Sequence, residues 1–225
     1  MRRAALLLAF CATAAGAQVP PGPEEVAQYT GLHAAAAHGD LGSLERLLSL
    51  RPNIEQRDRH GRTPLHVAVF MKHRSVVREL LKRGANANAF EDRRYDPVTI
   101  AAVADDPETL RILLAGGASA KNVTSPYDGT ALIAAAHLGH ETVVRQLIEA
   151  GAPLDHVNNL GWTALIESIV LGNGGKRHLQ TLRYLVEAGA KVDLADRNGK
   201  TPVALARDRG FREMEQILQR AGALQ

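Results

Sequence analysis

Apolar residues recur along this chain as pairs of short stripes separated by polar turns. Residues 58–90 hold the clearest copy, in which one stripe follows Thr63 and a second ends before Gly84. The apolar positions are Leu65, Ala68 and Val69, and then, after a polar break, Val76, Val77, Leu80 and Leu81. Spacings of three and four residues are typical of helices that bury one face, so the pattern predicts two short helices.

The polar residues at the borders of these stripes indicate where each helix begins and ends. Thr63 can accept backbone N–H groups as a helix cap, and Pro64 suits the first helical position, where its missing N–H costs nothing. Gly84 suits the left-handed residue that terminates a helix. The segment is therefore predicted to be a helix-turn-helix unit followed by an exposed polar turn.

The same unit occurs six times. A threonine-like position recurs with spacings of 33, 33, 34, 33 and 38 residues. The six copies begin at Thr30-Gly31-Leu32-His33, Thr63-Pro64-Leu65-His66, Asp96-Pro97-Val98-Thr99, Thr130-Ala131-Leu132-Ile133, Thr163-Ala164-Leu165-Ile166 and Thr201-Pro202-Val203-Ala204. Every copy after the first also contains a Gly-Ala pair. This pair lies 21 residues after the threonine-like position, except in the fifth copy, where the distance is 26 residues. The fifth copy thus contains an insertion, which fits best at residues 173–177, between its two helices.

A period near 33 with the motif Thr63-Pro64-Leu65-His66 resembles the ankyrin-repeat family, from about Glu25 to the C-terminus. The resemblance implies an all-α ankyrin-repeat solenoid of about six helix-turn-helix repeats with extended turn tips. One pair of short helices buries too little apolar surface to offset its chain entropy, so neighbouring repeats must share a core. The expected repeats are residues 25–57, 58–90, 91–123, 124–157, 158–195 and 196–225.

The N-terminus has the pattern of a secretory signal peptide over residues 1–17. A charged start at Arg2 and Arg3 precedes an apolar run that ends in the small-residue site Ala15-Gly16-Ala17. The run is too short for a permanent membrane span. Cleavage after Ala17 would also remove Cys11, the sole cysteine. We expect a periplasmic protein of a Gram-negative bacterium, or secretion as the second choice, with residues 18–24 as a proline-rich linker.

Charge distinguishes one repeat from the others. The chain has 27 Lys+Arg and 24 Asp+Glu, and loss of Arg2 and Arg3 leaves it close to neutral, which argues against nucleic-acid binding. Basic residues nevertheless crowd the second repeat and its borders. They are Arg57, Arg59, Arg62, Lys72, Arg74, Arg78, Lys82, Arg83, Arg93 and Arg94. This cluster is either a solvated face or a docking patch for an acidic partner.

The motifs of common catalytic and metal sites do not occur in this sequence. Its nine histidines lack zinc-ligand spacing, and its serines lie in no Gly-Xaa-Ser-Xaa-Gly elbow. The run Gly172 to Arg177 lacks the spacing and the Ser/Thr of a phosphate loop. In the ankyrin family, histidines at the positions of His33, His66, His140 and His178 have structural roles. We therefore expect no cofactor, no metal and no enzymatic activity.

The resemblance implies that a partner contacts the turn tips and the exposed side of the first helices. Tyrosine, tryptophan and arginine are frequent interface anchors, and several lie at these positions. The expected partner-binding residues are Arg62, Phe70, Met71, Tyr95, Tyr127, His137, Leu138, Trp162, Val170, Leu171, Lys176 and Arg177. Trp162 is expected to be the centre of this face, with a ring that the repeat core does not need. Lys176 and Arg177 are expected in a flexible basic loop.

Three functional hypotheses follow. The first is a monomeric, non-catalytic protein-interaction module that binds a protein partner on its concave face, with no nucleic acid and, after signal cleavage, no membrane. The second is an immunity-like inhibitor that occludes a toxin or hydrolase. The third and most remote is an enzyme.

The signal-peptide pattern predicts that the mature chain begins at Gln18. N-terminal sequencing of the protein from a periplasmic fraction checks this. A chain that retains Met1, or one found in the cytosol, would contradict the expected localisation.

Overall fold

The computed structural model describes residues 18–223, and the predicted signal peptide at residues 1–17 lies outside this range. The described chain contains thirteen helices and two very short strands. It divides into two compact units, Gln18–Pro126 and the part from Tyr127 onward, called here the N-terminal and C-terminal units. None of the described helices is long and apolar enough to cross a bilayer.

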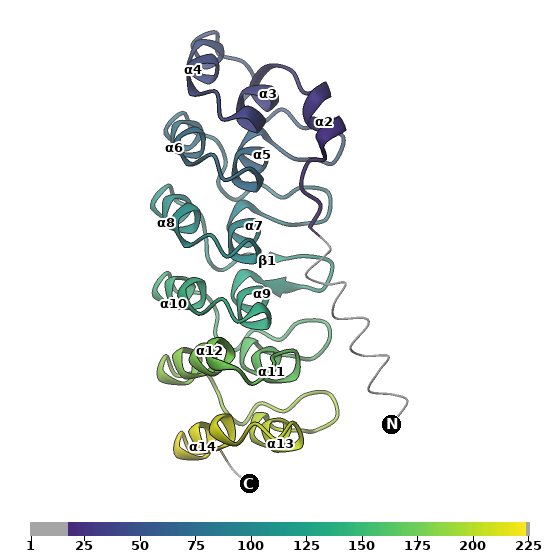
Figure 1. Ribbon diagram of the computed structural model, residues 1–225, viewed down its shortest axis with the longest axis vertical. Coiled ribbons are helices and arrows are strands. Elements are labelled where there is room, and N and C mark those ends of the chain that lie inside the picture. The colour runs from purple at the N-terminus through teal and green to yellow at the C-terminus, as the bar shows by residue number, and fades with distance from the viewer. Residues whose placement is uncertain (1–17, 224–225) are drawn as a thin grey trace. The chain divides into compact units, whose positions relative to one another are not determined.

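The N-terminal unit holds three helix pairs preceded by one additional helix. Its elements are α2 (Pro23–Gln28), α3 (Gly31–His38), α4 (Leu41–Ser49), α5 (Pro64–Phe70), α6 (Arg74–Lys82), α7 (Pro97–Val103), α8 (Pro107–Ala115) and β1 (Val123–Thr124). Within this unit, α3, α5 and α7 form one row, and α4, α6 and α8 form a second row beside it (Figure 1). This is the helix-turn-helix repeat that the sequence predicts.

The C-terminal unit repeats the arrangement. Its elements are β2 (Gly129–Thr130), α9 (Ala131–Leu138), α10 (Glu141–Glu149), α11 (Ala164–Val170), α12 (Lys176–Glu187), α13 (Pro202–Asp208) and α14 (Arg212–Arg220). The first helices α9, α11 and α13 contact one another in sequence, as do the second helices α10, α12 and α14.

Side-chain caps start most of the first helices, as predicted. The hydroxyl of Thr163 accepts a hydrogen bond from the backbone N–H of Ile166 at 3.2 Å. Where aspartate replaces threonine, Asp96 accepts from the N–H of Thr99 at 2.8 Å. Thr30 is the exception, because it precedes α3 without a side-chain bond. The caps satisfy backbone donors that the first helical turn leaves unpaired.

The predicted apolar stripes of the second helices form the core. Leu44, Leu80 and Leu110 have no exposed surface in the N-terminal unit, and Leu147 and Leu185 have none in the C-terminal unit. The outermost member of each stripe is often only half-buried, as Leu81 is in α6. Short amphipathic helices thus bury one face against the first helices and leave the other to solvent.

Two histidines link successive repeats by a hydrogen bond, and the ring of each lies against a glycine of the preceding repeat. The Nε2 N–H of His73, before α6, donates to the carbonyl oxygen of Ala37 at 3.1 Å, and that of His178 donates to the carbonyl oxygen of His137 at 2.9 Å. A Cβ placed on Gly139 would lie 2.8 Å from the ring of His178. The ring can therefore reach its acceptor because that position is glycine. The structural role predicted for His178 is confirmed.

Burial of Leu147 makes it a direct test of the shared core. Leu147→Ala should lower the free energy of unfolding by about 2–5 kcal/mol, because it removes buried methyl groups and leaves a cavity. Chemical denaturation measures the loss. Leu50→Ala is the matched control, since Leu50 is 78% exposed and should change stability by less than about 0.5 kcal/mol. Equal effects would contradict the helix register.

Candidate functional site

The three turn-tip residues predicted to anchor a partner are buried. The exposed fraction is 0% for Arg62, 4% for Tyr95 and 8% for Trp162. The prediction that these side chains project outward is therefore wrong. Each of the three directly precedes a helix cap, and its side chain is enclosed by the surrounding turns and helices, whereas Lys200 at the same position of the last repeat is exposed.

Arg62 is the centre of a buried polar network that holds the N-terminal segment. Its Nε donates to Asp58 Oδ2 at 2.7 Å, and its Nη2 donates to Glu25 Oε1 at 2.7 Å. Its Nη1 donates to the carbonyl oxygen of Val19 at 3.0 Å. The hydroxyl of Tyr29 donates to Asp58 Oδ2 at 2.6 Å. The segment expected to be a linker is thus tied to the second repeat, and α2 begins within it.

The network changes the ionisation of its members. Burial alone would raise the pKa of Asp58, but hydrogen bonds from the Tyr29 hydroxyl, from two backbone amides and from Arg62 lower it to about 2. Burial and the bond to Asp58 raise the pKa of Tyr29. Because the pKa of Asp58 is depressed on folding, its contribution to stability is present above about pH 4 and is lost as the pH falls toward 2.

Trp162 forms the floor of an apolar surface in the C-terminal unit. Its backbone N–H donates to Asn158 Oδ1 at 3.0 Å, which fixes the turn, and Trp162 forms a buried cluster with Ile166. Four half-buried apolar side chains pack against this cluster. They are Leu160, Val170, Leu171 and Leu205, called here the apolar strip. Trp162 was expected to lie on this surface. It instead lies beneath the surface and supports it.

The predicted residues at the ends of the first helices remain accessible. All are half-buried: Phe70 and Met71 in the N-terminal unit, and His137, Leu138, Val170 and Leu171 in the C-terminal unit. Tyr127 is half-buried as well, and its carbonyl oxygen accepts from the N–H of Asn159 at 2.9 Å. The structure places Val170 and Leu171 together in the apolar strip.

A buried carboxylate beside the apolar strip was missed by sequence reasoning. Glu167, in α11, is 5% exposed. Its Oε1 accepts from Asn158 Nδ2 at 2.7 Å, and its Oε2 lies 3.2 Å from His137 Nδ1. The available signal was the single charged residue of α11, at the centre of a mostly apolar helix. These bonds connect α9, α11 and the preceding turn, so they hold the backbone under the strip.

The basic insertion is not a flexible loop. Helix α12 begins at Lys176 with Gly175 as its N-cap, so Lys176 and Arg177 lie in the helix. The helix has 12 residues, compared with 9 in α10, and Arg177 Nε donates to Glu141 Oε2 at 2.8 Å. The prediction placed all five added residues in a loop, whereas the structure uses them partly to extend α12 at its N-terminus.

The remaining loop of the insertion is held by the sixth repeat. Arg209 donates from Nη1 to the carbonyl oxygen of Val170 at 2.7 Å and from Nη2 to that of Gly172 at 2.8 Å. Its guanidinium carbon also lies 5.1 Å from the centre of the Phe211 ring. Gly174 has φ +69°, and a Cβ there would lie 2.6 Å from that ring. Only glycine fits this close approach.

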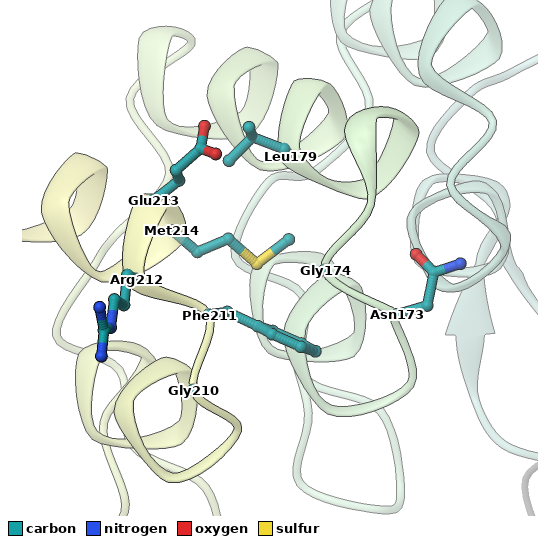
Figure 2. Close-up of a pocket in the computed structure, with 8 residues that line it drawn as sticks. All are labelled: Asn173, Gly174, Leu179, Gly210, Phe211, Arg212, Glu213 and Met214. Carbon is teal, nitrogen blue, oxygen red and sulfur yellow. The ribbon is translucent and has the colours of Figure 1, made fainter.

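A pocket of about 260 Å³ lies where this loop meets α14. Its lining residues are Asn173, Gly174, Leu179, Gly210, Phe211, Arg212, Glu213 and Met214. Figure 2 shows Phe211 and Met214 projecting from the sixth repeat toward the segment that holds Gly174 and Leu179. The lining contains no histidine, serine or cysteine, and Glu213 is its only carboxylate.

Across residues 18–223, no group of three or more His, Cys, Asp or Glu side chains is placed to hold a metal ion. The described surfaces offer apolar contact area, fixed backbone and charged side chains. This arrangement is suited to binding another macromolecule.

Residues 5–91 and 98–196 match the family model described as ankyrin repeats (3 copies), and the chain belongs to this family. It is 35% identical over 190 residues to the putative ankyrin repeat protein YahD of Escherichia coli K12, covering 84% of this chain and 94% of YahD. Ankyrin repeats typically serve as protein-interaction modules.

Two solved structures extend the comparison. An ankyrin repeat domain from Acinetobacter baumannii AYE has 44% identity and a TM-score of 0.83, covering 86% of this chain and 98% of that domain. A chain in the complex of the Bdellovibrio bacteriovorus endopeptidase Bd0816 with the immunity protein Bd3460 has a TM-score of 0.67, covering 85% of this chain and 98% of that one. At 22% identity, this second likeness concerns the fold alone.

The buried position of Arg62 predicts a structural role. Arg62→Ala should destabilise the protein by about 3–5 kcal/mol, because it leaves Glu25 and Asp58 without their buried counter-charge. Thermal or chemical denaturation measures this. Arg59→Ala is the control, because Arg59 contacts the same Glu25 oxygen at 3.0 Å but its side chain is 68% exposed. It should cost less than about 1 kcal/mol. Similar losses would show that Arg62 is no buried anchor.

Proposed function

We propose that this protein is a non-catalytic protein-interaction module of the periplasm, and that its partner binds on the apolar strip of the C-terminal unit. The observation that carries the proposal is the set of four half-buried apolar side chains packed on Trp162 and Ile166. Apolar side chains supported from below and surrounded by polar groups are characteristic of interface centres.

The backbone around the apolar strip is fixed before any partner arrives. Arg209 bonds two carbonyl oxygens next to Leu171, and Glu167 ties α11 to its neighbours. Lys200 and Asp208 form an ion pair, and their half-exposed side chains lie on the same repeat as Leu205. A rigid surface loses little conformational entropy on binding, which favours affinity for a given contact area.

The periplasmic location rests on the signal-peptide pattern of residues 1–17. The chain after Ala17 contains no cysteine, so its stability in an oxidising compartment would depend on repeat packing alone. The non-catalytic assignment is supported by membership of the ankyrin-repeat family, whose members are typically interaction modules.

An immunity-like inhibitor is the second candidate. A rigid exported repeat domain can cover the active site of a toxin or hydrolase. The Bdellovibrio complex, in which one chain has this fold, pairs an endopeptidase with an immunity protein. Both candidates use the same surface and differ in whether the captured partner is an enzyme that loses activity on binding.

The experiment begins by identifying the partner. Cross-linking capture from periplasmic extract with the wild-type protein supplies the candidate, whose affinity is then measured with purified components. Leu171→Glu should weaken binding at least about tenfold, because it places a charge in the centre of the apolar strip.

Val157→Glu is the matched control, because Val157 is an apolar residue of the same unit, 50% exposed and outside the strip. It adds the same charge and should leave affinity unchanged. If both variants bind as well as the wild type, or lose affinity equally, the strip is not the interface. Melting temperatures of both variants show whether each remains folded.

A further inference from the structure

A second surface lies on the second helices of the N-terminal unit, away from the ends of the first helices. Helices α6 and α8 contact each other, and a groove of about 330 Å³ lies between them. The groove is lined by Arg78, Leu81, Lys82, Arg111, Ile112, Ala115 and Gly116. Arg78 and Lys82 belong to the basic cluster for which the sequence left two interpretations open.

The floor of the groove is apolar. Ile112 is 6% exposed, and Leu81 is half-buried. Gly116, the C-cap of α8, allows the floor to form, because a Cβ there would lie 2.7 Å from Leu81 Cδ1. An alanine would push the Leu81 side chain away from its place. The glycine therefore helps to keep the groove open.

The walls carry three cations and no carboxylate. Arg78 is exposed and makes no hydrogen bond or ion pair with any described residue. Lys82 lies 3.9 Å from Glu79, whose other oxygen accepts from Arg83 at 2.7 Å. Arg111 pairs with Glu108, but both side chains are more than half exposed. Exposed pairs of this kind are weak and exchange readily for another anion.

Equivalent grooves in the other helix pairs have a different charge. Alignment of the second helices on their N-caps places Glu45, Arg111 and Arg145 at the position of Arg78. By this register, the groove between α4 and α6 would include Glu45 and Glu79, and the groove between α10 and α12 would include Glu149. The absence of carboxylates is therefore not a general property of the described repeats.

We propose that the α6–α8 groove binds an acidic peptide segment of a protein partner. One apolar side chain of the segment rests on Leu81 and Ile112, and its flanking carboxylates pair with Arg78, Lys82 and Arg111. Guanidinium groups bind carboxylates through paired hydrogen bonds, which suits the two arginines. This site goes beyond the proposed function, because it uses different helices and does not depend on the apolar strip.

The apolar floor favours a peptide over other polyanions. Nucleic acids bind through phosphate contacts to extended basic surfaces, and this groove has three cations around an apolar centre. A peptide can supply both the charge and the apolar side chain. Its binding should weaken with salt, because the ion pairs are exposed.

The test uses the folded protein and a fluorescent peptide with one central leucine flanked by glutamates. The double variant Arg78→Glu with Arg111→Glu should weaken binding by at least about tenfold in fluorescence anisotropy. The matched control is Arg145→Glu with Arg183→Glu, which changes net charge equally on α10 and α12 and should alter affinity less than about twofold. Equal losses would overturn the site, because they would indicate attraction by net charge alone.

Two further measurements test the floor. Gly116→Ala should weaken binding about threefold or more by displacing Leu81, and the fold should tolerate it, because alanine is the C-cap of α10, α12 and α14. A peptide with glycine in place of its leucine should bind at least about tenfold more weakly.

Equal binding of the leucine and glycine peptides, or no effect of Gly116→Ala, would overturn the apolar contact. Duplex DNA and vesicles containing phosphatidylglycerol serve as competitors. If either displaces the peptide more effectively than unlabelled peptide does, the groove is a general anion surface and the proposal fails.

Discussion

Each helix pair in this protein depends on its neighbours for a hydrophobic core. A nine-residue helix such as α6 or α10 has room for one apolar face and little more. That face is buried against the first helix of its own repeat and against adjacent repeats of its unit. Because the same faces are always hidden, the opposite faces are free to vary, and the differences between repeats lie there.

The sequence correctly predicts the features that follow the helical periodicity of the backbone. Helix spacing, the threonine caps and the leucines of the second helices follow from local rules, and the structure agrees at Thr163 and Leu147. Contacts between turns and helices follow no such period. Arg62 and Trp162 occupy a position that looks exposed in the repeat pattern, yet each is buried in the folded repeat. Chemical type alone could not reveal this.

The two proposed surfaces differ in chemistry and in the helices that form them. The apolar strip depends on a buried tryptophan and on carbonyl oxygens held by Arg209. The α6–α8 groove depends on cations that no internal partner engages firmly, and on a glycine at the end of α8. The basic second repeat contains one buried and one exposed arginine of this kind. Arg62 stabilises the fold, whereas Arg78 is available to solvent.

The extended helix α12 shows how a repeat can change length without losing its place in the array. Helix α12 has three residues more than α10, which is close to one helical turn. Because the added residues lie at the N-terminus of α12, Leu182 and Leu185 stay on the buried face. Growth by nearly a whole turn also returns the start of the helix to nearly the same side, whereas one additional residue would move that start by about 100° around the helix axis. An insertion of about one turn at this junction therefore leaves the buried face of the second helix in place, and such insertions offer an evolutionary route to repeats of unequal length.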